Sequence, residues 1–171
     1  MTDNAPTENA AVEKLREQLG DAVIGAAVFR GETAVTVSRE KILDALRYLK
    51  SAGFDYLADL CGADYPERPE RFDIVYNLLN MKTSERLRVK TRAGEDDAVP
   101  SATQLWEAAN WMEREAYDMY GVRFSNHPNL TRILMNDGFD GHPLRKDFPL
   151  KGTEAPEQRY GANDPRRREE E

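Results

Sequence analysis

The two histidines are the residues whose types point most directly to chemistry. His127 and His142 each precede a proline, and acidic residues that would complete a metal site follow nearby in the sequence: Asp137, Asp140 and Asp147. Imidazole nitrogen and carboxylate oxygen both bind zinc, and a metal-dependent hydrolase uses such a set. The spacing, however, matches neither a zinc nor an EF-hand calcium pattern. A free-standing metal-dependent hydrolase therefore stands only as a remote alternative.

The single cysteine, Cys61, adds little further chemistry. One cysteine allows no intramolecular disulfide and no iron–sulfur cluster built by this chain alone. A lone cysteine usually packs as a small buried apolar residue, and nothing marks Cys61 as an activated nucleophile. Glycine-rich phosphate loops of the GxGxxG and P-loop kinds do not occur in the sequence. We expect no catalytic residue, no metal ligand and no cofactor-binding residue in this chain.

Composition limits the classes of partner. The chain has 171 residues, 40% of them hydrophobic, and a formal net charge of −7. This length suits one domain with tails. The negative charge argues against nucleic acid and against docking onto anionic lipid. No run approaches the roughly 20 apolar residues that cross a bilayer, so we expect no direct membrane insertion. The first residues also lack the features of a signal or transit peptide.

Hydrophobic periodicity predicts an α+β fold. Helices are expected over 10–19, 39–52 and about 102–120, and strands over 22–29, 33–37, 55–64, 71–80 and 86–92. The order α-β-β-α-β-β-β-α is typical of a two-layer α+β domain rather than a Rossmann-type sheet. We divide the chain into a flexible N-terminus (1–9), the α+β domain (10–121), an irregular extended C-terminal arm (122–150) and a polar C-terminal tail (151–171).

The strand over 86–92 alternates basic with apolar residues. Its four cations, Arg86, Arg88, Lys90 and Arg92, fall on one face because strand side chains have a period of two. One interpretation is a solvated face, or an edge strand protected against aggregation. The other is a basic strip that pairs with acidic groups of a partner, since the rest of the chain is acidic.

Two residues break the amphipathic pattern of the last predicted helix. Glu113 lies within the apolar arc and Trp111 lies among charged residues. A carboxylate on a packed face needs a partner. We predict that Glu113 is held by backbone donors of the C-terminal arm or by an arginine, with Arg123, Arg132 and Arg145 as candidates. The alternative is that Glu113 reaches water at the helix margin. Trp111 suits a partner's pocket, or else it packs under the arm.

The C-terminal arm has little regular pattern but many residues that form interfaces. Gly121 ends the helix, while Pro128, Pro143 and Pro149 each remove a backbone donor and favour extended geometry before them. We assign structural roles to these four residues and to Glu113. Each histidine is expected to hold the arm through a ring hydrogen bond.

The same segment carries a family resemblance. The runs Glu113-Arg114-Glu115, Tyr117-Asp118-Met119-Tyr120-Gly121-Val122, Arg132-Ile133-Leu134 and Gly141-His142-Pro143-Leu144-Arg145-Lys146-Asp147-Phe148-Pro149-Leu150 are the densest part of it. They resemble the signature of the 30 kDa subunit, also called the C subunit, of proton-pumping NADH:quinone oxidoreductase, respiratory complex I. Thr131 departs from the Leu-Arg-Arg that the family pattern suggests.

The resemblance implies a cofactor-free structural subunit of the hydrophilic arm of complex I. Such a subunit packs against the D (49 kDa) subunit and neighbouring hydrophilic-arm subunits, peripherally, at the cytoplasmic side of the bacterial inner membrane. FMN and iron–sulfur clusters are implied in those partner subunits. The predicted partner-docking residues are Trp111, Arg114, Tyr117, Tyr120, Phe124, His127, Arg132, Phe139, His142, Arg145, Lys146, Asp147 and Phe148. The alternative is the homologous subunit of a membrane-bound hydrogenase, deazaflavin dehydrogenase or ferredoxin dehydrogenase complex.

Overall fold

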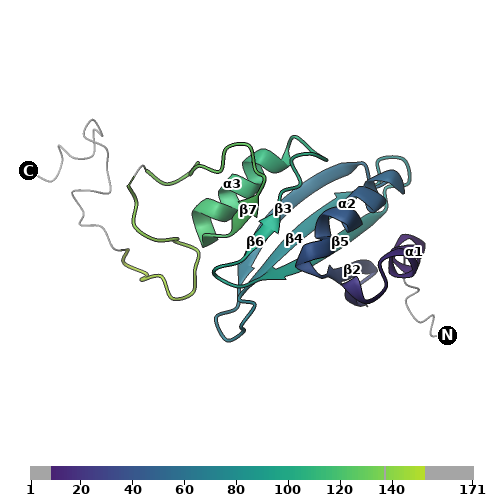
Figure 1. Cartoon of the computed structure of the whole chain (residues 1–171), viewed down its shortest axis with the longest axis horizontal. Helices are drawn as coiled ribbons and strands as arrows, with labels where there is room; N and C mark the ends of the chain where they lie inside the picture. Colours follow the sequence, from purple (N-terminus) through teal and green to yellow (C-terminus); the bar gives the residue numbers. More distant parts are fainter. Residues whose placement is uncertain (1–8, 137, 153–171) are drawn as a thin grey trace, which may run out of the picture.

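A mixed five-stranded sheet forms one layer, and α-helices on one of its faces form the other (Figure 1). The computed structural model describes residues 9–136 and 138–152. The helices are α1 (Ala10–Leu19), α2 (Ile42–Ser51) and α3 (Ala109–Tyr120), with 3₁₀ turns η1 (Gly20–Ala22) and η2 (Arg39–Lys41). The strands are β1 (Val23–Phe29), β2 (Glu32–Val37), β3 (Tyr56–Asp64), β4 (Phe72–Leu79), β5 (Arg86–Ala93), β6 (Ala98–Pro100) and β7 (Arg123–Ser125). The predicted two-layer α+β class is confirmed.

The strand order in the sheet is β1-β2-β5-β4-β3. β2 and β5 pair in parallel, and the other neighbours are antiparallel. Leu87, Val89 and Thr91 of β5 point into the core, so the four cations of this strand lie on the opposite face. Because β5 lies inside the sheet, the interpretation of this strand as a protected edge is wrong.

The core lies between the sheet and the helices. Val12 and Leu15 of α1, and Ile42, Leu46 and Leu49 of α2, are fully buried against the inward side chains of the strands. Helical spacing of these apolar residues is what creates each packing face. The side chain of Asn9 accepts a hydrogen bond from the N–H of Ala11 and caps α1. Apart from Asn9, the predicted flexible N-terminus lies outside the described residues, as does the predicted tail beyond Gly152.

The last helix is shorter than predicted: α3 begins at Ala109, and residues 102–108 form turns. Several polar groups of this segment bond outside a helical pattern. The N–H of Ala102 donates to Glu113, the Lys50 ammonium donates to the carbonyl of Leu105, and the Trp106 indole donates to the carbonyl of Asp55. These bonds tie the segment to Glu113, Lys50 and Asp55, all of which lie outside it. Hydrophobic periodicity does not reveal them.

Two short strands were not predicted. β6 and β7 pair in parallel, with Val99 opposite Phe124. Val122 and Phe124 belong to the hydrophobic core, although the predicted boundary assigns both to the C-terminal arm. Core packing therefore continues to β7. The irregular course of the arm begins only after Ser125.

Candidate docking site

The C-terminal arm ends on a buried arginine of the sheet. Arg71, just before β4, contacts three carboxylates. Its Nε and Nη2 atoms lie 2.6 and 2.8 Å from the two oxygens of Asp64, and its Nη2 and Nη1 atoms lie 2.8 and 2.9 Å from the two oxygens of Asp147. The third carboxylate is that of Glu95, 2.6 Å from Nη1. The N–H of Lys146 donates to Asp64 at 2.7 Å. The Arg71 guanidinium is the main cause that holds the pKa of Asp64 below its ordinary value. This cluster joins residue 147 to two strands of the sheet.

A second cluster is built on Asp118 of α3, which is fully buried. Its Oδ2 accepts three consecutive backbone N–H groups, from Ile133, Leu134 and Met135, at 3.0, 2.7 and 2.9 Å. Arg132 donates to Oδ1 at 2.8 Å and also to the carbonyl of Gly141. Burial alone would raise the pKa of Asp118, but these donors hold it below its ordinary value. One carboxylate thus fixes the path of the arm over 132–135.

The carbonyl end of α3 is covered by the arm. His142 Nδ1 lies 2.9 Å from the carbonyl of Asp118, and Arg145 Nε donates to the carbonyl of Tyr120 at 2.6 Å. These donors serve carbonyls that the end of a helix leaves without intrahelical partners. Burial lowers the pKa of His142, which favours its neutral form. The expected ring hydrogen bond of His142 is therefore present.

Gly121 makes this close approach possible. It ends α3 with φ 80°, a left-handed conformation that favours glycine. A Cβ at this position would lie 2.6 Å from Arg145 Nη2 and 2.7 Å from the His142 ring. The structural role assigned to Gly121 thus has two causes, the backbone turn and the contact with the arm.

Glu113 is held differently from the prediction. It is fully buried, with Ser101 Oγ donating to Oε2 at 2.7 Å and the N–H of Ala102 donating to Oε1 at 2.6 Å. Both donors follow β6 directly. The predictions of an arginine partner, of backbone donors from the arm and of a water-exposed margin are wrong. Burial raises the pKa of Glu113 to about 7, against the opposing effect of the two donors.

His127 connects the arm to this buried carboxylate. Its Nε2 lies 3.2 Å from the carbonyl of Asn110 and 3.9 Å from Glu113 Oε2, and its Nδ1 accepts from the N–H of Asn129. This pattern places the proton of the neutral ring on Nε2. The expected ring hydrogen bond of His127 is also present.

Both histidine rings therefore bind backbone groups of α3, and they do so at separate places. Over the residues that the structure describes, no group of three or more His, Cys, Asp or Glu side chains is arranged to hold a metal ion. Asp137, one of the ligands considered for a metal site, lies outside those residues. Cys61 is exposed rather than buried, which corrects the expectation from its type. It follows the buried Leu60 on β3, so strand alternation turns its side chain to the face of the sheet away from the core.

Several predicted docking residues are used inside the chain. Phe124 is 4% exposed and packs in the core, so its side chain does not contribute to the surface. Tyr120 lies against Gly62, where an added Cβ would come within 2.7 Å of its ring. Phe139 and Phe148 stack on each other with ring centroids 6.0 Å apart. These contacts, together with those of Arg132, Arg145 and Asp147, fold the arm against its own domain.

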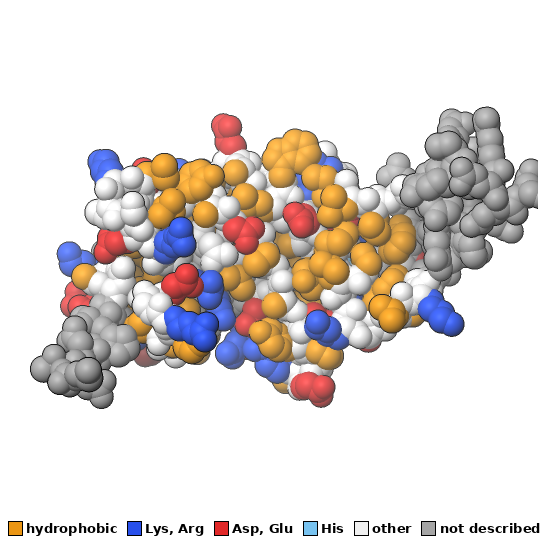
Figure 2. All heavy atoms as spheres, turned by 180° about the vertical axis from the view of Figure 1, so that it is seen from behind, with side chains coloured by type: hydrophobic (Ala, Val, Ile, Leu, Met, Phe, Trp, Pro, Cys, Tyr) orange, Lys and Arg blue, Asp and Glu red, His pale blue; other side chains and the backbone are white. Residues whose placement is uncertain are grey.

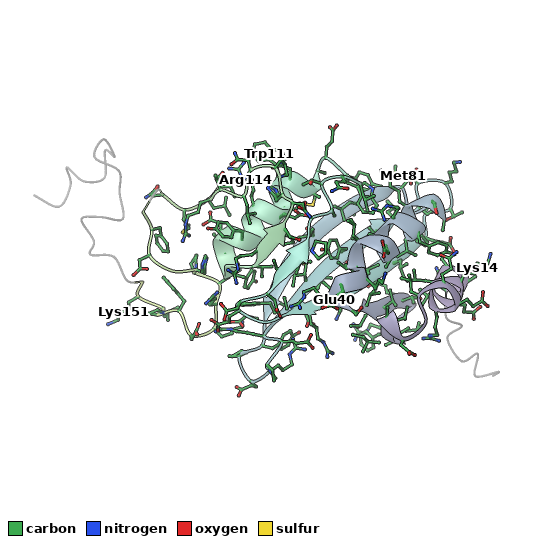
Figure 3. All side chains as sticks on the ribbon, viewed as in Figure 1. Lys14, Glu40, Met81, Trp111, Arg114 and Lys151 are labelled. Carbon is green, nitrogen blue, oxygen red and sulfur yellow. The ribbon has the colours of Figure 1, made fainter. Side chains whose placement is uncertain are left out.

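Other predicted docking residues face outward. Trp111 is 61% exposed, and the Arg114 guanidinium lies 5.0 Å from its ring centroid (Figure 3). Arg114 also donates to the carbonyls of Thr131 and Arg132, which fixes its orientation. A hollow of about 570 Å³ adjoins the indole, lined by Thr103, Gln104, Glu107, Asn110, Trp111, Asn126 and Pro128. Trp111 packs beside the arm rather than under it. We call Trp111, Arg114 and this hollow the Trp111 surface.

Tyr117 and Lys146 complete the account of the predicted docking residues. The Tyr117 ring meets the His142 ring edge-on at 6.1 Å and is partly exposed, while the Lys146 side chain is exposed. Pro128 and Pro149 are exposed and Pro143 is partly buried. Leu134 and Leu144, 56% and 49% exposed, add apolar area that was not predicted.

Sequence reasoning missed the two most connected groups, Asp118 and Arg71. Asp118 falls on the polar arc of the helical pattern, so it is expected to face water. Arg71 and Asp64 stand at facing ends of β4 and β3, with Asp64 paired to Phe72 in the register. Opposite charges at two adjoining strand ends are a signal for such a pair, although they do not identify Asp147 as the third member.

Fold and site together define a class of protein: a two-layer α+β domain whose irregular C-terminal arm is held by buried ion pairs and helix-end hydrogen bonds. The family model described as "Respiratory-chain NADH dehydrogenase, 30 Kd subunit" matches residues 35–154. The chain belongs to this family.

Individual relatives agree with the family. The chain is 50% identical over 147 residues to the C 1 subunit of NADH-quinone oxidoreductase from Rhizobium meliloti (strain 1021), covering 84% of this chain and 73% of the relative. It is 47% identical over 148 residues to the corresponding C subunit from Citrifermentans bemidjiense, covering 85% and 92%.

Two solved structures resemble the fold. One is a trypsin-resistant fragment of Nqo5, with a TM-score of 0.63 and 32% identity over 70% of this chain and 99% of that one. The other is a chain of the membrane-bound sulfane sulfur reductase, an archaeal respiratory membrane complex, with a TM-score of 0.70 and 27% identity over 81% and 84%. Among the described residues, no helix is long and apolar enough to cross a membrane.

Proposed function

We propose that this chain is a cofactor-free, non-catalytic subunit of the hydrophilic arm of NADH:quinone oxidoreductase. It holds the quinone-reducing module together while electrons pass from NADH to quinone through other subunits. Membership of the 30 kDa subunit family is the observation that carries the proposal, supported by about 50% identity to proteins named as C subunits of NADH-quinone oxidoreductase.

The geometry supports a docking role for the C-terminal arm. Its contacts with Arg71, Asp118 and the end of α3 fix its path before any partner binds. Preorganisation of this kind reduces the entropy lost on association. The arm and α3 leave Trp111, Leu134 and Leu144 exposed. An exposed tryptophan with an arginine against it is a typical centre of a protein interface.

We propose the D (49 kDa) subunit as the main partner of the Trp111 surface, with further contacts to neighbouring hydrophilic-arm subunits. FMN and iron–sulfur clusters belong to partner subunits in this assignment. The chain is placed at the cytoplasmic side of the bacterial inner membrane, peripherally, through those partners. Its negative net charge supports attachment through protein rather than through anionic lipid.

A second candidate is the corresponding subunit of a related membrane-bound complex with another electron donor. The similarity to a chain of the sulfane sulfur reductase favours it. The identity there is 27%, against 50% for the C 1 subunit of Rhizobium meliloti, so NADH is the better-supported donor.

Purification of the native assembly through a tag on this chain tests the proposal. We expect companions that include a 49 kDa subunit together with an NADH- and flavin-binding module. Companions that lack such a module support the second candidate. An isolated chain with no redox companions in the cell contradicts both.

A matched truncation tests the arm. The shortened chain should end after Leu130, because Val122 and Phe124 are core residues and Leu130 packs against the core. We expect a folded domain that no longer joins the complex, because the remaining arm residues and their contacts are gone. Normal assembly of this truncated chain would contradict the docking role of the arm.

A further inference from the structure

The face of the sheet that the helices leave open carries the four cations of β5. Figure 2 looks at the molecule from the side opposite the helices, and basic side chains gather there beside hydrophobic ones. The register places Ala34 and Thr36 of β2 next to Arg88 and Lys90, and Asn77 and Val75 of β4 on their other side. Three carboxylates share this face with the cations: Glu32 beside Arg88, Asp73 beside Arg92, and Asp59, which accepts a hydrogen bond from Asn77. We call this surface the open sheet face.

The four cations are not equally compensated. Arg88 lies 3.2 Å from Glu32 and donates to Asn77, and Arg92 lies 3.8 Å from the buried Asp73. Arg86 and Lys90 form no ion pair within residues 9–136 and 138–152. Two cations thus stay available in a chain whose net charge is −7.

Exposed aromatic residues lie at both edges of the sheet in the row that contains Arg86. Phe29 pairs with Glu32 across the β1–β2 hairpin, while Tyr56 pairs with Leu79, which pairs with Arg86. Phe29 is 70% exposed and Tyr56 is 51% exposed. The row therefore presents an aromatic ring, a carboxylate, a cation, an aliphatic side chain and a second aromatic ring.

A hollow of about 260 Å³ opens at the centre of this row. Its lining includes Glu32, Ala58, Asn77, Leu79, Arg86 and Arg88. Pockets for small molecules typically have volumes of about 300–1,000 Å³. The hollow is below that range, and it suits a single apolar side chain beside a cation.

We propose that the open sheet face is a second docking surface, and that it takes an extended acidic segment of a partner protein with one apolar side chain in the hollow. Arg86 and Lys90 are four residues apart on one strand, which corresponds to about 13 Å. Two carboxylates four residues apart in an extended peptide have the same spacing.

The charges favour a peptide over a nucleic acid. Glu32, Asp59 and Asp73 stand beside the row of cations and would repel a continuous phosphate backbone. An acidic peptide places its charges only at intervals, so it is able to meet Arg86 and Lys90 and avoid the three carboxylates. This surface lies on the side of the sheet opposite α3, and the inference does not depend on the role proposed for the Trp111 surface.

Photocrosslinking in the native assembly tests this inference. Benzoylphenylalanine replaces Tyr56 in the full chain, the cells are irradiated, and mass spectrometry identifies the crosslinked peptide. We expect a protein segment with acidic residues four apart. The double variant Arg86→Glu/Lys90→Glu should lower the crosslink yield about tenfold, since each exposed charge contributes modestly. Lys14→Glu, at an exposed cation of α1, should leave the yield unchanged.

Several results would overturn the inference: no crosslink, a crosslink to nucleic acid or lipid, a segment without the acidic pair, or a yield that the double variant leaves unchanged. If the double variant does not fold, Arg86→Gln/Lys90→Gln and a salt titration of the wild type replace it, and the yield should fall in both. The same crosslinker at Trp111 reports separately on the function proposed above.

Discussion

Asp147, near the end of the C-terminal arm, forms a two-oxygen contact with the guanidinium of Arg71 on the sheet, at 2.8 and 2.9 Å. Asp64, on β3, forms a similar contact with the same guanidinium at 2.6 and 2.8 Å. Arg71 therefore connects the arm to the domain through two carboxylates. The Asp147 side chain is 61% exposed, whereas the Asp64 side chain is fully buried. The two halves of this contact should differ in energy.

Substitutions in this cluster should have unequal effects. Arg71→Ala leaves the Asp64 carboxylate buried without its cation, which typically costs about 3–5 kcal/mol. Asp147→Asn removes a contact that solvent already screens, so its effect should stay below about 1 kcal/mol. Chemical denaturation measures both free energies of unfolding. Equal losses for the two variants would contradict the central role of the Arg71–Asp64 pair.

The Asp118 cluster should control local order in the arm. Three backbone N–H groups and Arg132 donate to the Asp118 carboxylate. Asp118→Asn removes its negative charge and leaves a single neutral amide oxygen, which is a weaker acceptor for these donors. We expect amide hydrogen exchange at residues 133–135 to become about 10-fold faster or more, which corresponds to a loss of about 1.4 kcal/mol. Glu115→Gln, at an exposed carboxylate of the same helix, is the control. Unchanged exchange in Asp118→Asn would contradict this role.

Much of the domain is predictable from local pattern. Alternation in β5 and helical spacing in α2 place Val89 and Leu46 in the core, because burial of one face is what produces these periods. The course of the arm is not predictable in this way. It depends on Arg71, Asp118 and Gly121, whose partners lie far away in the sequence. Hydrophobic periodicity indicates which side of a helix or strand is apolar, but it does not indicate which residue pairs with a buried charge.

The burial of Glu113 is predictable from the helical pattern, but its hydrogen-bond donors are not. Its place within an apolar arc predicts a buried carboxylate, and it is fully buried. Its donors, Ser101 and Ala102, stand where the predicted loop meets the start of the predicted helix, and the helical pattern does not indicate either contact. The turn that ends the pattern is the feature that satisfies the carboxylate. Only the tertiary structure shows that Ser101 and Ala102 satisfy this carboxylate.

The Trp111 surface should contribute to assembly more than to folding. Trp111→Ala removes an indole that is 61% exposed, so the free energy of unfolding should change by less than about 1 kcal/mol. If Trp111 lies at the centre of an interface, the same substitution should reduce the free energy of binding by about 2 kcal/mol or more, which lowers the affinity for the partner at least about 30-fold. Quantitative co-purification through a tagged partner measures the loss. Met81→Ala, with the same exposed fraction, is the matched control, and an equal loss in both variants would remove Trp111 from the interface.

The buried Glu113 should make stability fall as pH rises. Its pKa is about 7 in the folded chain because of burial, against the ordinary value of 4.5 for an unfolded glutamate. Between these two values the folded state holds a proton that the unfolded state has lost, so each rise in pH destabilises the fold. The contribution of the neutral carboxyl is complete below about pH 4.5 and is lost by about pH 7, with an upper bound of about 3 kcal/mol.

A variant isolates this effect from other groups. The pKa of His142 is lowered by burial, so its contribution is lost as pH falls below its ordinary value, which is the opposite direction. Glu113→Gln keeps one acceptor for Ala102 and one donor for Ser101, as the protonated acid does. The difference in free energy of unfolding between wild type and Glu113→Gln should therefore shift against the wild type from pH 5 to about pH 7 and level off above it. A difference that is independent of pH would show that Glu113 stays ionised when buried, and that Ser101, Ala102 and the nearby His127 suffice to stabilise its charge.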